Sequence, residues 1–311
     1  MMATILRLVL AGIATAIAAL SAGLILRGGW HPATAIAVSV VTALVCYAAV
    51  LGLEFLIARR VGGPMVPAWR VDAMAVPRLW LGEVAASLRV FAWDQPFLAR
   101  RAVRSQTTTG RIPVLLVHGY CCNRGLWRRF APRLAKAGHP LGAVDLEPPF
   151  GSIDRYPDIL EAGIDRLRQR TGAERVALVG HSMGGLAIRA YLAREGWQHI
   201  AGVATIGSPH RGTRIASLSP ARNARQMRIG SRWLAQLAAR EAPPPAGAFT
   251  VILSHHDNIV TPQSGQTIPG ATTIEVSGVG HMAMLDDHRV QAAVLEALDR
   301  ADSVTAPAHQ K

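Results

Sequence analysis

The pentapeptide GHSMG at residues 180–184 follows directly on the apolar run RVALV at residues 175–179. A strand that ends here and turns at once into a helix holds Ser182 in a strained backbone, and glycines on both flanks leave room for the turn. The serine hydroxyl then lies at the start of a helix, whose unpaired N–H groups, that of Met183 first, point toward negative charge developing beside it. The pattern therefore predicts Ser182 as a nucleophile and the Met183 amide as an oxyanion donor.

A second oxyanion donor is predicted in the loop after another strand. The run PVLLV at residues 113–117 is typical of a buried strand in a parallel sheet, and it leads into His118-Gly119-Tyr120. Acyl transfer needs two donors on the oxyanion, and the loop after such a strand commonly supplies the second. We assign this role to the backbone N–H of Tyr120.

A serine nucleophile needs a base, and the base needs an orienting acid. A serine hydroxyl is a poor nucleophile at neutral pH, so an imidazole must accept its proton and a carboxylate must hold that imidazole. Strand-like runs at 249–253 and 273–276 lead to Asp257 and His281, respectively. The order serine, acid, histidine, each beyond the carboxyl end of a strand, is expected on such a sheet. We therefore predict His281 as general base and Asp257 as its acid.

Other polar residues are alternatives for these roles. We interpret His255 and His256 as residues of the acid loop, and His118 and His181 as braces of the oxyanion and nucleophile loops. Asp145 stays open as an alternative acid. The remaining candidates are His210, predicted to shape the pocket floor, and Asp286 and Asp287, predicted to form a polar start to the last helix.

Taken together, these segments resemble bacterial lipases and esterases of the α/β-hydrolase superfamily. The resembling residues are 118–120, 180–185, 205–213, Asp257 with Val260 and Pro262, and 280–282. The stretch at 205–213 is similar to the one after the fifth strand of triacylglycerol lipases, which favours a lipase over a peptidase, dehalogenase or epoxide hydrolase. No aspartate pair surrounds the histidine loop as in calcium-binding members, so we expect neither a metal nor another cofactor.

Strands and helices are predicted to alternate through residues 107–302, the expected hydrolase domain. Strands are expected near 113–117, 141–145, 175–180, 201–206, 248–254 and 272–276, and helices near 125–137, 154–170, 183–195 and 288–300. This alternation predicts an α/β fold, a mostly parallel sheet with helices on both faces and the site at the strand carboxyl ends. Residues 303–311 are predicted to be a disordered tail.

Residues 213–247 are predicted to be a cap or lid insertion within this domain. Residues 231–240 carry apolar side chains at helical spacing, with Trp233, Leu234 and Leu237 on one side. Two interpretations stay open: a mobile helix that exposes an apolar face to lipid, or a fixed helix packed on the sheet.

The first sixty residues are predicted to form a transmembrane helical hairpin. Ile5–Leu26 and Ala33–Ala58 each contain one charged residue, Arg7 and Glu54. About 20 apolar residues suffice for a helix to cross a bilayer core of about 30 Å, and the turn at 27–32 is too short for a folded domain. The alternative is that the first segment is a cleaved signal peptide.

The charge pattern predicts the orientation of this hairpin. Arginines follow the second segment at positions 59, 60, 70 and 78, whereas the turn has only Arg27 and the N-terminus only Arg7. The positive-inside tendency therefore predicts an inner-membrane protein with its hydrolase domain in the cytoplasm. Cys46 and the adjacent Cys121-Cys122 offer no disulfide framework, in agreement with a reducing compartment.

Residues 61–106 are predicted to be an amphipathic linker. Its apolar side chains recur at helical spacing, at Val76, Trp80, Val84, Leu88 and Phe91, while Arg78 and Arg89 lie off this stripe. Such a helix either lies in the lipid headgroup region or packs on the hydrolase domain.

The charge composition limits the classes of binding partner that we expect. The net charge of the 311 residues is +13, but the arginines are scattered and accompany no nucleic-acid-binding motif, so we expect no nucleic acid. Attraction to anionic lipid explains the charge better. The sequence thus predicts a membrane-anchored serine hydrolase of lipid or other apolar esters. Thioester hydrolysis, acyl transfer and a non-catalytic membrane scaffold with a vestigial site stay open as alternatives.

Overall fold

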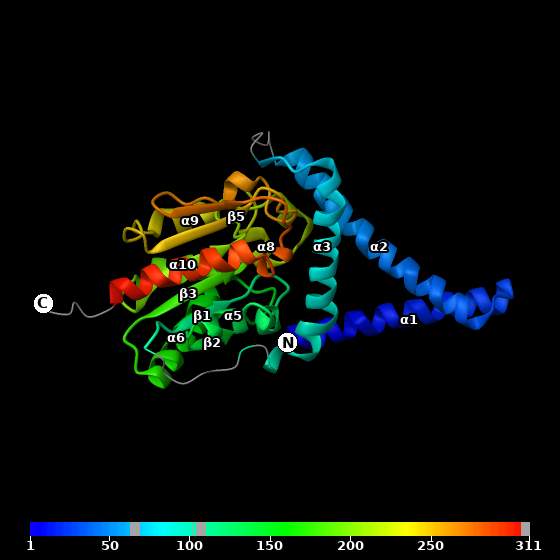
Figure 1. Cartoon of the computed structure of the whole chain (residues 1–311), viewed down its shortest axis with the longest axis horizontal. Helices are drawn as coiled ribbons and strands as arrows, with labels where there is room; N and C mark the ends of the chain where they lie inside the picture. Colours follow the sequence, from blue (N-terminus) through cyan, green and yellow to red (C-terminus); the bar gives the residue numbers. More distant parts are fainter. Residues whose placement is uncertain (63–68, 102, 104–109, 306–311) are drawn as a thin grey trace, which may run out of the picture.

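The computed structural model describes residues 1–62, 69–101, 103 and 110–305. Figure 1 shows a sheet with helices on both faces, and further helices from the N-terminal part of the chain at its side. Two of these, α1 (Met2–Gly28) and α2 (Pro32–Val61), meet at a tip away from the sheet, and α3 (Val76–Arg89) runs between them and the sheet (Figure 1). The predicted boundary at residue 106 lies outside the described residues.

Six parallel strands form one sheet in the order β2-β1-β3-β4-β5-β6. Their bounds are Val114–Val117 (β1), Leu141–Val144 (β2), Val176–His181 (β3), Ile200–Ile206 (β4), Phe249–Ser254 (β5) and Thr272–Val276 (β6). The four central strands are buried along their whole length, because helices cover both faces of the sheet. Their residues therefore do not alternate between buried and exposed, as they would in a strand with one face in water. The predicted α/β fold with a parallel sheet is confirmed.

The helices divide between the two faces of the sheet. On one face the core includes residues of α5 (Ala131–Lys136) and α10 (His288–Thr305), together with Ala86 and Val90 from the α3 region. On the other it includes α6 (Tyr156–Thr171), α7 (Met183–Glu195) and α9 (Arg232–Arg240). The remaining short helices are α4 (Gln95–Phe97) and α8 (Arg222–Gln226).

Two predicted boundaries are corrected by the structure. The helix expected at 125–137 is split into a 3₁₀ turn at Arg124–Arg128 and α5, because Pro132 has no N–H to extend a helix from the preceding residues. The last helix continues to Thr305, three residues into the predicted tail, and residues 306–311 lie outside the described residues.

The two N-terminal helices are long and apolar enough to cross a membrane, judged by length and composition. Few of their side chains are buried within the molecule. α1 ends at Gly29, whose left-handed φ of 65° suits glycine, and α2 begins with Pro32, whose fixed φ suits a first helical turn.

Helix α3 packs on the α/β domain through a face that the sequence did not reveal. Its buried residues are Leu79, Glu83, Ala86 and Ser87. The predicted stripe beginning at Val76 is exposed or half-buried instead. One of its members, Trp80, contacts α2, since its Nε1 donates to the carbonyl of Ala48 at 2.9 Å. Helix α3 therefore packs between α2 and the α/β domain.

Candidate functional site

Ser182 occupies a strained turn between β3 and α7. Its φ is 55° and its ψ is −128°, values that L-residues rarely adopt. A Cβ on Gly184 would lie 2.2 Å from the carbonyl oxygen of Val117, and one on Gly180 would lie 2.7 Å from Cδ1 of Ile188. The two glycines are therefore required for the strand, turn and helix to approach this closely.

The loop after β1 lies directly beside the serine. A Cβ on Gly119 would lie 2.7 Å from Cβ and 3.2 Å from Oγ of Ser182. Within the described chain, the backbone N–H groups of Tyr120 and Met183 donate no hydrogen bond to another residue. Two unpaired donors thus flank the serine from two different elements, as an oxyanion site requires.

Asp257 and His281 form a buried pair at the ends of β5 and β6. Nδ1 of His281 lies 2.9 Å from Oδ2 of Asp257, whose side chain is fully buried. The other oxygen of Asp257 accepts from the backbone N–H groups of Ile259 and Val260 at 2.8 and 2.7 Å. A carboxylate only accepts, so Nδ1 carries a proton and Nε2 is left as the basic nitrogen.

This pair lies against the strand that supports the serine. A Cβ on Gly207 would lie 3.0 Å from Oδ2 of Asp257 and 3.2 Å from Nδ1 of His281. The preceding residue, Ile206, accepts a 2.9 Å hydrogen bond from the N–H of Ser182. The ring centroids of His281 and His181 are 4.6 Å apart. All three predicted catalytic residues thus lie around the carboxyl ends of β3, β4, β5 and β6.

The hydroxyl of Ser182 itself makes no hydrogen bond to His281 or to any other described residue. The acid and the base are therefore in direct contact. The serine is connected to this pair only through the backbone of neighbouring residues. Hydrogen bonds of this kind are commonly long without substrate and tighten when it binds.

Electrostatics favour a basic His281. Burial alone would lower its pKa, but the charge and hydrogen bond of Asp257, followed by the charges of Glu83 and Glu54, raise the pKa above its ordinary value. The neighbouring His181 shows the opposite result, because burial and then the charge of His281 lower its pKa well below the ordinary value. His281 is thus the stronger base of the two.

The histidines considered as alternatives serve the loops. Nε2 of His118 accepts from the N–H of Leu146 at 2.9 Å, so its Nδ1 donates to the carbonyl of Gly119. Nε2 of His181 lies 3.3 Å from the carbonyl oxygen of His281. His255 contacts Glu275 and stacks on Trp69. His256 accepts a hydrogen bond from the N–H of Gly278. His210 contacts the hydroxyl of Thr205 and the ring of Phe249.

The alternative carboxylates are also occupied elsewhere. Asp145 accepts from the backbone N–H and from Nε of Arg124, at 2.7 and 2.8 Å. Asp286 pairs with Arg89 of α3, and Asp287 accepts from the N–H of Arg289 at the start of α10. Asp257 is thus the acid that contacts His281.

Two acidic residues near His281 were missed by the sequence reasoning. Glu83 accepts from the backbone N–H groups of Met282 and Ala283, both at 2.9 Å, although only 1% of its surface is exposed. Glu54 accepts from Nδ2 of Asn258 at 2.8 Å. A charged residue inside an apolar span is costly, so the single carboxylate of α2 was the available signal.

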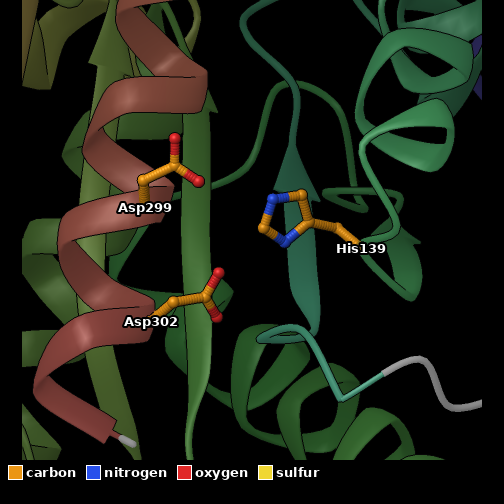
Figure 2. A group of neighbouring side chains, drawn as sticks. All are labelled: His139, Asp299 and Asp302. Atoms are coloured by element: carbon orange, nitrogen blue, oxygen red, sulfur yellow. The ribbon is translucent and has the colours of Figure 1, made fainter.

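A second group of titratable side chains lies at the opposite end of the sheet. Figure 2 shows Asp299 and Asp302 of α10 pointing toward His139, which precedes β2. Their ligand atoms lie within 4.8 Å of one another, the spacing of a metal site. The guanidinium of Arg111 pairs with both carboxylates, and its Nη2 lies 3.2 Å from Nε2 of His139. Because a cationic side chain already pairs with both carboxylates, we interpret this group as an ion-pair network.

The insertion at 213–247 packs firmly through α9. Leu234 and Leu237 belong to the core on that face of the sheet. Ser231 caps the helix by accepting from the N–H of Leu234, and Nε1 of Trp233 donates to Asp154 at 2.7 Å. The part nearest the oxyanion loop is different, since Leu218 is 78% exposed and its neighbour Ser219 contacts the Tyr120 hydroxyl at 2.8 Å.

Comparisons with known proteins agree with this geometry. Residues 112–237 match the family model of the alpha/beta hydrolase fold. The chain is 35% identical over 115 residues to triacylglycerol lipases of Pseudarthrobacter phenanthrenivorans and Burkholderia plantarii. Each match covers 34% of this chain, and 35% and 32% of those relatives, so the chain spans about a third of their length.

Solved structures share the fold at low sequence identity. Bacillus licheniformis lipase BlEst2 in its mature form superposes with a TM-score of 0.53 at 16% identity, over 62% of this chain and 94% of that chain. Aspergillus fumigatus lipase B gives a TM-score of 0.55 at 18% identity, over 65% and 56% of the two chains. These similarities establish the α/β-hydrolase fold.

Proposed function

This chain carries an α/β-hydrolase domain similar to bacterial lipases and esterases, and we propose that it cleaves carboxylic esters with Ser182, His281 and Asp257. The observation that carries the proposal is the buried Asp257–His281 pair, packed against the strand end that holds the strained Ser182 turn. A strained nucleophile, a base of raised pKa and two unpaired N–H groups are the parts that acyl transfer needs.

The proposed reaction proceeds through an acyl-enzyme. Oγ of Ser182 attacks the acyl carbon while Nε2 of His281 takes the hydroxyl proton, and Asp257 stabilises the resulting imidazolium. The N–H groups of Tyr120 and Met183 bind the oxyanion. The intermediate collapses as His281 gives the proton to the departing alcohol. Water then attacks the acyl carbon while His281 takes one of its protons, and the histidine returns this proton to Oγ as the bond from the acyl carbon to Oγ breaks, which releases the acid and free Ser182.

Apolar side chains at the rim of the oxyanion loop support an apolar ester as substrate. The ring of Phe150 packs edge-on against Tyr120 with centroids 5.7 Å apart, and 41% of its surface is exposed. Leu218 adds an exposed aliphatic group beside the Ser219–Tyr120 contact. Exposed apolar groups gathered at one site favour lipid-like ligands.

Membrane anchoring through α1 and α2 is the second part of the proposal. Arg7 of α1 donates to the carbonyl of Pro96 at 2.8 Å and lies over the ring of Phe97, so α1 is attached to residues close to the hydrolase domain. Such contacts favour a retained first helix over a cleaved signal peptide. Arg59 and Arg60 at the end of α2 favour a cytoplasmic hydrolase domain.

A serine-directed probe tests the function directly. We expect a fluorophosphonate to label the full-length protein, and Ser182→Ala to abolish both the labelling and the turnover of a p-nitrophenyl ester. The exposed Ser217→Ala is the matched control and should leave both intact. Absence of labelling in the wild type would instead support a non-catalytic scaffold, and turnover retained by Ser182→Ala would refute the nucleophile.

A further inference from the structure

Two carboxylates outside the proposed triad contact the segments that carry His281 and Asp257. Both come from helices that precede the hydrolase domain: Glu54 from α2 and Glu83 from α3. The match to the hydrolase family model begins at residue 112, so neither glutamate lies within it. The contacts therefore connect the N-terminal helices to the residues that handle the proton.

Glu83 holds the backbone immediately after the histidine. Oε1 accepts from the N–H of Met282 and Oε2 from that of Ala283, both at 2.9 Å. Gly280, just before the histidine, is equally close, because a Cβ there would lie 2.6 Å from Oε2 of Glu83. One carboxylate thus fits against the chain on both sides of His281.

Glu54 reaches the histidine through one intermediate. Oε2 accepts from Nδ2 of Asn258 at 2.8 Å, and Oδ1 of Asn258 accepts from the N–H of His281 at 3.0 Å. Asn258 directly follows Asp257, so this bridge ties the acid and the base to the same point on α2. Phe55 adds an apolar contact, since its Cζ lies 3.0 Å from where a Cβ on Gly280 would be.

The cost of burying Glu83 argues for a role beyond packing. A buried carboxylate loses its hydration and is retained only where hydrogen bonds replace it. Burial raises the pKa of Glu83 to about 7, even though the hydrogen bonds from Met282 and Ala283 lower it. An apolar residue would fill the same space without this cost, but it would leave two backbone N–H groups beside His281 without acceptors.

We propose that Glu83, and Glu54 acting through Asn258, are positioning residues for His281. Helices α2 and α3 would then contribute to the geometry of the hydrolase site. The inference rests on the proposed function. The three backbone N–H groups of residues 281–283 are all held by this arrangement, so the imidazole is oriented from the N-terminal helices as well as by Asp257.

Full-length variants with a p-nitrophenyl ester test this role. Glu83→Gln keeps the shape but offers one oxygen for two N–H groups, and Glu54→Leu removes the partner of Asn258 while preserving an apolar helix. We expect each to lower kcat about 10- to 100-fold with KM unchanged, because a misplaced base impairs chemistry and not binding. The rate of fluorophosphonate labelling should fall in parallel. Glu174→Gln, at an exposed site, is the matched control and should keep wild-type values.

The outcomes separate this inference from the function on which it depends. If the wild type neither labels nor turns over ester, the proposed function fails. If the wild type is active and both variants, folded by gel filtration and tryptophan fluorescence, keep kcat within about twofold, the positioning role is overturned. A rise in KM at constant kcat would overturn it as well. If Glu83→Gln does not fold, the result with Glu54→Leu decides.

Discussion

Nδ1 of His281 and Oδ2 of Asp257 are 2.9 Å apart in a site from which water is largely excluded. The carboxylate accepts two backbone hydrogen bonds through its other oxygen, so it cannot turn away from the imidazole. This arrangement fixes the tautomer of His281 and raises its pKa, although burial by itself acts in the other direction.

The raised pKa predicts the acid limb of the pH profile. A base must be neutral to act, and a raised pKa keeps His281 protonated to higher pH, so kcat/KM should fall as pH drops through a midpoint above the ordinary 6.5. Asp257→Asn should move this midpoint down and lower kcat by roughly 10⁴-fold. Initial rates from pH 5 to 9 measure both, and a midpoint unchanged in Asp257→Asn would contradict the pairing.

Gly119 should not tolerate a side chain. A methyl group there would lie 2.7 Å from Cβ of Ser182 and 3.1 Å from the carbonyl oxygen of His181, so the oxyanion loop would have to move. We expect Gly119→Ala to lower kcat about 10²- to 10³-fold, as losing an oxyanion donor does. Gly82→Ala is the matched control, because a Cβ on this exposed glycine of α3 meets nothing within 4 Å. Equal kcat values in the two variants would exclude the close approach.

Helix α9 should behave as a fixed cap. Leu237 is fully buried, and the Ser231 cap and the Trp233–Asp154 hydrogen bond secure the same helix. We therefore expect activity toward a short-chain ester to rise smoothly through the solubility limit of that ester. An abrupt increase when an interface appears would instead support a mobile lid.

The orientation in the membrane can be checked with reporters. A C-terminal fusion should be active with a reporter that works only in the cytoplasm and inactive with one that works only outside it, because Arg59 and Arg60 lie in the last turn of α2. A reporter inserted in the turn between α1 and α2 should give the reverse pattern. Identical patterns at the two sites would exclude a hairpin that crosses the membrane.

The sheet could be predicted closely from the sequence because its signals are local. The central strands β1, β3, β4 and β5 are short apolar runs followed by glycine, serine or histidine, and helices cover them on both faces. Asp257 follows β5 and His281 follows β6, so the order of these residues along the chain was enough to place them at one edge of the sheet.

The role of α3 could not be predicted in the same way. Its apolar stripe, which begins at Val76, suggested one packing face, but the helix buries Glu83 and Ser87 on another. Hydrophobic periodicity cannot identify a face that packs through a carboxylate. The partners of Glu83 are backbone N–H groups, which every residue except proline offers and which therefore leave no trace in the sequence.

The contact between Glu83 and Met282 also sets an order of events during synthesis. The two residues are 199 positions apart, so at roughly 5 to 20 residues per second the ribosome delivers the carboxylate about 10 to 40 seconds before its partner. A nascent chain that ends between these two residues therefore has Glu83 but not yet His281, which directly precedes Met282. The proposed triad is therefore incomplete until residue 281 has been added, and a shorter chain lacks the base that ester cleavage requires.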